Sequence, residues 1–282
     1  MYDSNLGVLY VVATPIGNLS DMVPRAIETL QKVDVIAAED TRHSAKLLQY
    51  FGISTKVMAY HDHSNEHRLQ ALIDILLSGQ SIALISDAGT PLISDPGYKL
   101  VNVAREHSVR VVPIPGACAL VAALSVSGLP SNQFVFEGFL PAKSSSRCKI
   151  LESMRREHRT AIFYESPHRI VDSLKDFQSV LGGDRCLVIA RELTKTFETV
   201  LSGTITDVIE QVREDANQQR GEFVVLLKGC EQKAENATIT EDAERLMRIL
   251  LEYVPIKIAS AIAAKVTGIK KRQLYQWALG LK

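Results

Sequence analysis

Short apolar runs alternate with amphipathic segments along the first half of the chain. The apolar runs are rich in β-branched residues and predict buried strands at 7–13, 34–38, 56–60, 81–86 and 110–115. The segments that follow them have helical spacing, at 21–32, 41–51, 66–77, 97–106 and 116–126. Unbroken alternation of strand and helix predicts parallel strands joined by crossover helices. Residues 1–126 are therefore expected to form an α/β domain.

The alternation resumes after a linker at 127–133. Apolar runs predict strands at 134–139, 159–166, 186–193, 198–203 and 221–229, and helices are expected near 145–158, 167–181 and 204–214. Hairpin-like neighbours indicate a mixed sheet, so residues 127–232 are predicted to form a second α/β domain. The composition then turns polar and acidic, as in a tether. Residues 233–282 are expected to form a small helical domain that ends in a helix-turn-helix broken at Thr267-Gly268.

Composition narrows the class of protein. Apolar residues make up 46% of the 282 residues, which is ample for packed cores, and the longest apolar stretches are too short to span a bilayer. The N-terminus has no basic region ahead of an apolar run, so a signal peptide is not expected. The four cysteines lie far apart without a C-x-x-C pair, which disfavours a zinc site. We expect a cytoplasmic protein with no membrane span.

The net charge is zero, but basic residues gather in two segments. One lies between 141 and 159, and the other runs from 256 to the end without an acidic residue. Such segments are either phosphate-binding surfaces or solvated helix faces, and charge alone leaves both open. The candidate contacts to phosphate are Lys143, Arg147, Lys257, Lys270, Lys271 and Arg272.

Loops of unusual chemistry follow the predicted strands of the first domain. They are 14–21 (TPIGNLSD), 39–43 (EDTRH), 86–97 (SDAGTPLISDPG) and 115–119 (PGACA). Ligands of open α/β sheets bind beyond the carboxyl ends of the strands, and glycine allows a close backbone approach. A carboxylate such as Asp87 can take a ribose hydroxyl or an ammonium group. In the second half of the repeated SD sequence, Asp95 before Pro96 is expected to cap the next helix.

The sequence also bears on other enzyme classes and on a metal site. The absence of G-x-G-x-x-G, of a P-loop and of G-x-S-x-G removes the main support for a dinucleotide dehydrogenase, a P-loop enzyme and a serine hydrolase. His61, His63 and His67 could ligate a metal, but a polar wall of a substrate cleft is favoured and no metal is expected. The charged segments 163–169 and 190–198 are either a substrate-facing wall or an internal salt-bridge network. Trp277 and Tyr275 are expected in the core of the tail.

Seven segments, in order, carry a resemblance to a known family: VATPIGNLSD, AAEDTRH, LISDAGTPLISDPG, PIPGACA, FYESPHR, ARELTKTFE and GEFVVLL. They resemble the methyltransferases of tetrapyrrole-methylase fold, and more closely the branch that methylates a cytidine ribose 2′-oxygen in the decoding region of 16S ribosomal RNA. The resemblance covers residues 7 to 282. Its first loop has one glycine, unlike the glycine-rich loop of the porphyrin branch.

This resemblance implies two α/β domains of tetrapyrrole-methylase type, with S-adenosylmethionine (SAM) in the cleft between them. It also implies a homodimer, and 16S rRNA within the small ribosomal subunit as partner. The family pattern and the strand-end loops together give the expected SAM contacts: Pro15, Asp87, Ala88, Gly89, Thr90, Cys118 and Ala119.

The 2′-hydroxyl is a weak nucleophile, so a positioned base would assist its attack. No motif identifies that base. Asp40 and Lys195 are the first candidates, followed by Glu39, Glu165 and Glu192; Lys195 would need a lowered pKa to act. Two rival functions stay open, a methyltransferase of the same fold acting on a small tetrapyrrole and a non-catalytic RNA-binding module.

Overall fold

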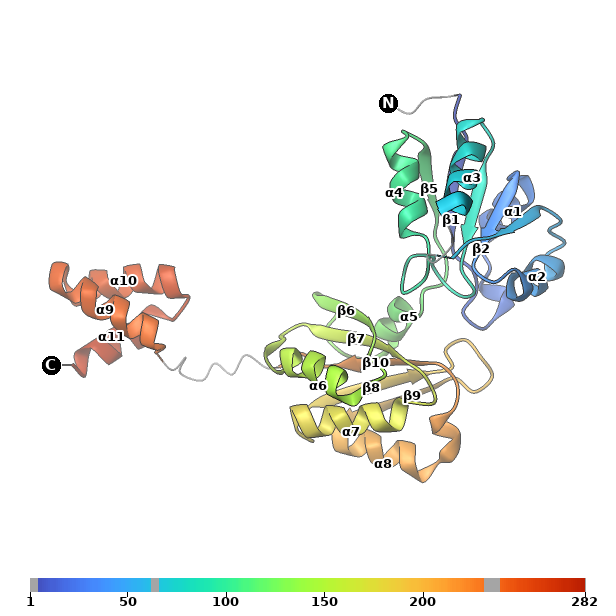
Figure 1. The fold of residues 1–282 in the computed structure, drawn as a ribbon. Helices are drawn as coiled ribbons and strands as arrows, with labels where there is room; N and C mark the ends of the chain where they lie inside the picture. The colour runs from blue at the N-terminus through green and yellow to red at the C-terminus, as the bar shows by residue number, and fades with distance from the viewer. Residues whose placement is uncertain (1–4, 62–65, 231–238, 282) are drawn as a thin grey trace. The chain divides into compact units, whose positions relative to one another are not determined.

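The computed structural model describes residues 5–61, 66–230 and 239–281 (Figure 1). The chain divides into two compact units, Met1–Cys230 and Glu231–Lys282. Among the described residues, no helix combines the length and the apolar character needed to cross a membrane.

The first sheet of the larger unit is parallel throughout. Its five strands have the order β3-β2-β4-β1-β5 and are β1 (Val8–Val12), β2 (Val35–Ala38), β3 (Lys56–Ala59), β4 (Ile82–Ile85) and β5 (Arg110–Ile114). Helices cover both faces, which explains why the central strands read as unbroken apolar runs. α3 (Glu66–Leu77) and α4 (Tyr98–Glu106) pack on one face, and α1 (Pro24–Lys32) and α2 (Thr41–Tyr50) pack on the other (Figure 1).

The second sheet is mixed, as its hairpin-like neighbours predicted. Its order is β6-β7-β10-β8-β9, and its strands are β6 (Phe134–Phe139), β7 (Thr160–Glu165), β8 (Cys186–Arg191), β9 (Thr199–Thr204) and β10 (Phe223–Leu227). The β6–β7 pair is parallel, and the other pairs of this sheet are antiparallel. Its core packs against α6 (Ser144–Ser153), α7 (Ile170–Leu181) and α8 (Ile205–Glu214).

Helix α5 (Ala119–Val126) packs on the second sheet. Leu120, Ala123 and Leu124 form a buried cluster with side chains of β7, β8 and β10. By packing, this helix belongs with the second sheet, so the second lobe begins before the expected boundary at 126/127. The helix therefore links the loop after β5 directly to the second lobe.

The smaller unit contains three helices in its described part, α9 (Glu241–Tyr253), α10 (Ile256–Thr267) and α11 (Lys271–Leu279). Gly268 ends α10 in the left-handed region, at φ 74°, which explains the helix break expected at Thr267-Gly268. Trp277 packs against the core of this unit, as expected, and the Arg248 guanidinium lies 5.6 Å from its ring centre. Tyr275 is half-buried.

Candidate functional site

Backbone and side-chain hydrogen bonds join the loops at the carboxyl edge of the first sheet. Thr14 and Gly89 exchange two backbone hydrogen bonds, of 2.8 and 3.0 Å. The Thr90 hydroxyl donates to the Ala117 carbonyl at 2.9 Å, and the Asp40 N–H donates to the Asp87 carboxylate at 3.1 Å. The four loops singled out by the sequence therefore meet at one edge of the sheet.

A cavity of about 390 Å³ lies between these loops and the second sheet. Of the seven expected SAM contacts, six line it: Asp87, Ala88, Gly89, Thr90, Cys118 and Ala119. Pro15 is buried and is not among the residues described as lining the wall, whereas its neighbour Ile16 is. Gly89 has φ 83°, so replacing it by valine would strain the backbone as well as fill the cavity.

The second lobe supplies the opposite wall, which includes Tyr164 and Ser166 at the end of β7, and Leu193 and Glu222. The Tyr164 hydroxyl accepts a hydrogen bond from the Leu120 N–H at 3.2 Å, and burial raises its pKa. The rings of Phe136 and Phe139 contact the Tyr164 ring edge-on, at centroid distances of 4.9 and 5.5 Å. Tyr164 and Ser166 belong to the FYESPHR segment, Leu193 to ARELTKTFE and Glu222 to GEFVVLL, although none of these four residues was itself a candidate. Phe139 lies outside all seven segments, so no motif pointed to it.

Asp40 performs a structural task at the start of α2. Its carboxylate accepts hydrogen bonds from the N–H groups of Arg42 at 2.8 Å and His43 at 3.3 Å. These backbone hydrogen bonds lower the pKa of Asp40, which makes it a weaker base. Neither Asp40 nor Glu39 is among the described residues that line the cavity. The geometry therefore disfavours both as the base.

Glu165 borders the cavity, but its carboxylate is fully buried. It forms an ion pair with Arg169 at 3.0 Å and accepts hydrogen bonds from the Ser173 hydroxyl and the Ser166 N–H. These partners fix the end of β7 against α7. Glu165 therefore holds the wall in place, and this geometry disfavours it as the base.

Lys195 and Glu192 neutralise each other at the edge of the second lobe. The Lys195 ammonium lies 2.8 Å from Glu192 and 3.0 Å from Glu222. Burial lowers the pKa of Lys195, but hydrogen bonds to the two carboxylates outweigh burial and raise it overall. For Glu192 burial raises the pKa, while the hydrogen bond from Lys195 and the backbone of Glu222 lower it overall. The lowered pKa that a lysine base needs is not present.

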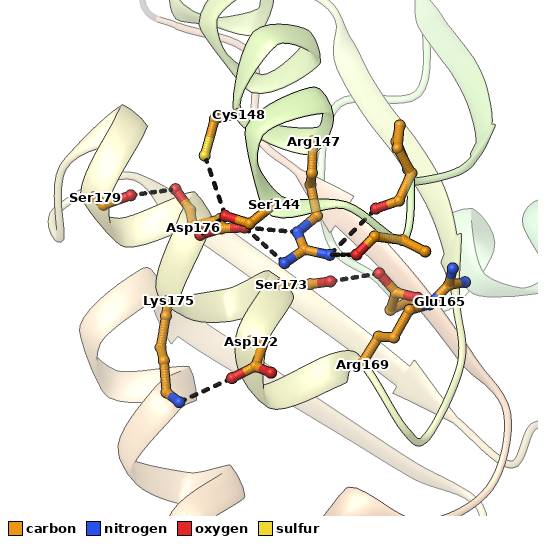
Figure 2. Close-up of polar contacts among 12 residues, drawn as sticks. Ser144, Arg147, Cys148, Glu165, Arg169, Asp172, Ser173, Lys175, Asp176 and Ser179 are labelled. Atoms are coloured by element: carbon orange, nitrogen blue, oxygen red, sulfur yellow. Dashed lines mark hydrogen bonds and ion pairs between the residues drawn. The ribbon is translucent and has the colours of Figure 1, made fainter.

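The structure changes the expected set of RNA contacts at Arg147. Its side chain is only 3% exposed, and its guanidinium points into the second lobe, where it pairs with Asp176 at 2.6 Å (Figure 2). A buried, paired guanidinium is not available to a phosphate, so the geometry disfavours Arg147 as an RNA contact. Sequence could not reveal this, because Asp176 lies on another helix. The other candidates are exposed: Lys143, Lys257, Lys270, Lys271 and Arg272.

Asp95 is not a helix cap. Helix α4 begins at Tyr98, its N-cap position is Gly97 at φ 135°, and no side chain caps it. Asp95 instead lines the cavity. Burial raises its pKa to about 6, with a lowering contribution from a hydrogen bond with Ser86 and a further rise from the nearby Asp87.

The histidine segment is described only in part, because His63 lies outside the described residues. Among those that are described, no group of three or more His, Cys, Asp or Glu side chains could hold a metal ion.

Comparison with solved structures places the fold. A cobalt precorrin-4 methyltransferase has a TM-score of 0.58 at 16% identity, over 78% of this chain and 94% of that chain. A diphthine synthase has the same TM-score at 15% identity, over 78% of this chain and 89% of that chain. The family model of tetrapyrrole (corrin/porphyrin) methylases matches residues 8–209. The larger unit thus has the fold of the tetrapyrrole methylases.

Curated relatives extend the match to the tail. "Ribosomal RNA small subunit methyltransferase I" of Escherichia coli O157:H7 is 51% identical over 277 residues, 98% of this chain and 96% of the relative. The protein of that name from Vibrio cholerae is 53% identical over 272 residues, 96% of this chain and 94% of the relative. Residues 237–282 match the model of the RsmI C-terminal HTH domain. The chain therefore belongs to the tetrapyrrole methylase family and, within it, to the ribosomal RNA small subunit methyltransferase I group.

Proposed function

We propose that this protein transfers a methyl group from SAM to the ribose 2′-oxygen of a cytidine in the decoding region of 16S ribosomal RNA. The observation that carries the proposal is the near-full-length identity with the rRNA methyltransferase I relatives, which includes the C-terminal helical unit. The cavity between the two lobes supplies a place for the reaction.

The cavity fits SAM in size and in chemistry. Its volume of about 390 Å³ falls in the range of small-molecule sites, roughly 300–1,000 Å³. At Gly89 a Cβ atom would lie 3.2 Å from Ile16, so the absence of a side chain keeps this part of the wall open. Ala88 and Ala119 leave room for a flat ring, and Asp87 offers a carboxylate to a ribose hydroxyl or an ammonium group. When bound, SAM would supply an electrophilic methyl group on a sulfonium.

The protein's part is alignment. Correct approach geometry can supply roughly 7–11 kcal/mol of a reaction barrier. The Thr14–Gly89 bridge and the Thr90–Ala117 hydrogen bond hold the loops of the first sheet in place. On the other side, the Glu165–Arg169 pair fixes the end of β7. We propose that RNA enters between these two walls.

The rival small-tetrapyrrole function predicts an apolar, uncharged cleft. The residues that line the cavity instead include Asp87, Asp95 and Glu222, so its wall is not uncharged and can offer acceptors to the hydroxyls of a ribose. The solved small-molecule methyltransferase compared above covers 78% of this chain, whereas the rRNA methyltransferase relative covers 98%. Both observations favour the RNA substrate.

The test is a methyl-transfer assay with labelled SAM on small ribosomal subunits from a strain that lacks this enzyme. Free 16S rRNA is assayed in parallel, and the modified nucleotide is mapped by mass spectrometry. One methyl group on a cytidine ribose is expected. Modification of a base, or no transfer to either RNA substrate, would refute the proposal.

We also propose that the chain acts as a homodimer in the cytoplasm, where its RNA substrate resides. Light scattering after gel filtration tests the assembly, and a monomer at micromolar concentration would contradict it.

A further inference from the structure

Asp95 occupies a position between the two walls of the cavity. It belongs to the long loop after β4, together with Asp87 and Gly89, and all three line the cavity. Next to it, Ser94 reaches the second lobe: a Cβ at Gly138 of β6 would lie 3.4 Å from the Ser94 hydroxyl. The pKa of Tyr164 on β7 is raised mainly by burial, and the charge of Asp95 contributes to that rise. Asp95 therefore faces the space between the expected SAM loops and the RNA-facing wall.

The backbone is bent to bring Asp95 there. Leu92 and Ser94 have φ angles of 74° and 64°, in the left-handed region that side-chain-bearing residues seldom adopt. Such conformations are strained and persist where the surrounding structure enforces them, commonly at functional sites. The strain does not serve a helix cap, because α4 begins after Gly97 without one.

Other carboxylates near the cavity are already engaged by the protein. Glu165 is fully buried on Arg169 and Ser173, and Glu222 is paired with Lys195. The carboxylate of Asp87 accepts the Asp40 N–H. The pKa of Asp95 is raised by burial, lowered by the Ser86 hydrogen bond and raised by Asp87. No cation is among these influences. The proton affinity of Asp95 near neutral pH suits a general base.

We propose that the Asp95 carboxylate accepts the proton of the ribose 2′-hydroxyl during methyl transfer, an assignment that rests on the proposed function. The 2′-oxygen forms a bond to the methyl carbon as the bond from that carbon to sulfur breaks. The electron pair of the broken bond stays on sulfur, and the hydroxyl proton moves to a carboxylate oxygen of Asp95. Water then takes the proton from Asp95, which restores the carboxylate.

The test compares Asp95→Asn with the control Asp74→Asn, which removes an exposed carboxylate on α3 of the same lobe. Methyl transfer to small ribosomal subunits is followed in single turnover from pH 5 to 9, and SAM affinity is measured by calorimetry. We expect Asp95→Asn to bind SAM but to react about 10²–10⁴-fold more slowly. The wild-type rate should fall as pH drops through about 6, and the residual rate of Asp95→Asn should lack that inflection.

A second readout needs no reaction. Because the pKa of Asp95 is raised in the folded protein, its charge destabilises the fold increasingly as pH rises from its unfolded value through about 6. Asp95→Asn should therefore raise Tm relative to wild type at pH 8, and the gain should shrink toward pH 4. A lower Tm at pH 8 would show that the carboxylate supports the fold and would overturn the assignment.

The kinetic outcomes separate the two proposals. Suppose that the wild-type enzyme methylates RNA. If Asp95→Asn then reacts as fast as Asp74→Asn, or if its rate keeps the pH inflection, only the role of Asp95 is overturned. A wild-type enzyme that methylates neither the subunit nor free RNA overturns the proposed function, and the role of Asp95 falls with it.

Discussion

Replacing Arg147 by methionine should destabilise the larger unit without affecting RNA binding. The guanidinium donates to Asp176 through Nε at 2.7 Å and Nη2 at 2.6 Å (Figure 2). Its Nη1 donates to the carbonyls of Pro141 and Ala142 at 3.2 and 3.3 Å. One side chain thus ties the segment before α6 to α7.

The magnitude follows from what the substitution leaves behind. Methionine replaces the buried aliphatic stem, so the loss of packing is small. The Asp176 carboxylate, only 16% exposed, would lose its cation and keep one hydrogen bond, from Ser144 at 3.1 Å. Removing one partner of a buried pair typically costs about 3–5 kcal/mol, and we expect the lower end because Ser144 remains. Adding Asp176→Asn to Arg147→Met should recover part of the loss, since no buried charge is then left unpaired.

The assay is urea unfolding of the full chain, followed by circular dichroism and by tryptophan fluorescence. Trp277 is the only tryptophan, so fluorescence reports on the smaller unit and should not shift. The matched control Lys143→Met changes an exposed residue and should alter stability by less than about 0.5 kcal/mol. A cost below about 1 kcal/mol for Arg147→Met would refute the reasoning, as would a loss of salt-dependent RNA affinity greater than that of Lys143→Met.

Three further changes test the cavity, the contact between lobes and the tail. Ala88→Leu should fill part of the cavity and raise the Kd for SAM at least about tenfold, which corresponds to a loss of about 1.4 kcal/mol of binding free energy. Ala88→Ser should leave the Kd unchanged, and equal affinities of the two variants in calorimetry would contradict the placement of SAM. Gly17→Val should lower Tm and SAM affinity together, because a Cβ there would clash with Lys195 Cγ and lie 2.8 Å from Thr194 Oγ1 of the second lobe; an unchanged Tm would contradict the contact. Deleting 237–282 should weaken RNA binding and reduce its salt dependence, while SAM binding should be unchanged. If RNA affinity were unchanged, the basic residues of the tail would only form a solvated helix surface.

The helices and strands of this fold could be predicted because each depends mainly on the pattern of residues within its own segment. The strands β2 and β4 in the middle of the first sheet are buried at every position, so they appear in the sequence as unbroken apolar runs. Loops after such strands share one edge, so glycine and proline there indicated the site. Packing of α5 could not be predicted, because an apolar helix between two sheets can cover either of them.

The roles expected for Arg147 and Glu165 are disfavoured by contacts that the sequence does not show. The sequence shows that Arg147 is charged, but its partner Asp176 lies on α7, and only the fold brings the two together. The same holds for Glu165, which Arg169 and Ser173 engage from the following helix. Charge in a sequence predicts chemistry only when its neighbours in space are known.

The repeated sequence LISDAGTPLISDPG shows how a local rule can be overridden. Both halves place an aspartate before a small residue, and a helix follows the second half, so capping was the simplest reading of Asp95. In the structure, Gly97 takes the position next to the helix at φ 135°, where a Cβ would lie 2.7 Å from Leu84. With Gly97 there, the left-handed turns at Leu92 and Ser94 carry Asp95 into the cavity. The two halves therefore bring two carboxylates to one site: Asp87 is joined by its hydrogen bond to the neighbouring first-lobe loop, and Asp95 acts electrostatically on Tyr164 in the second lobe.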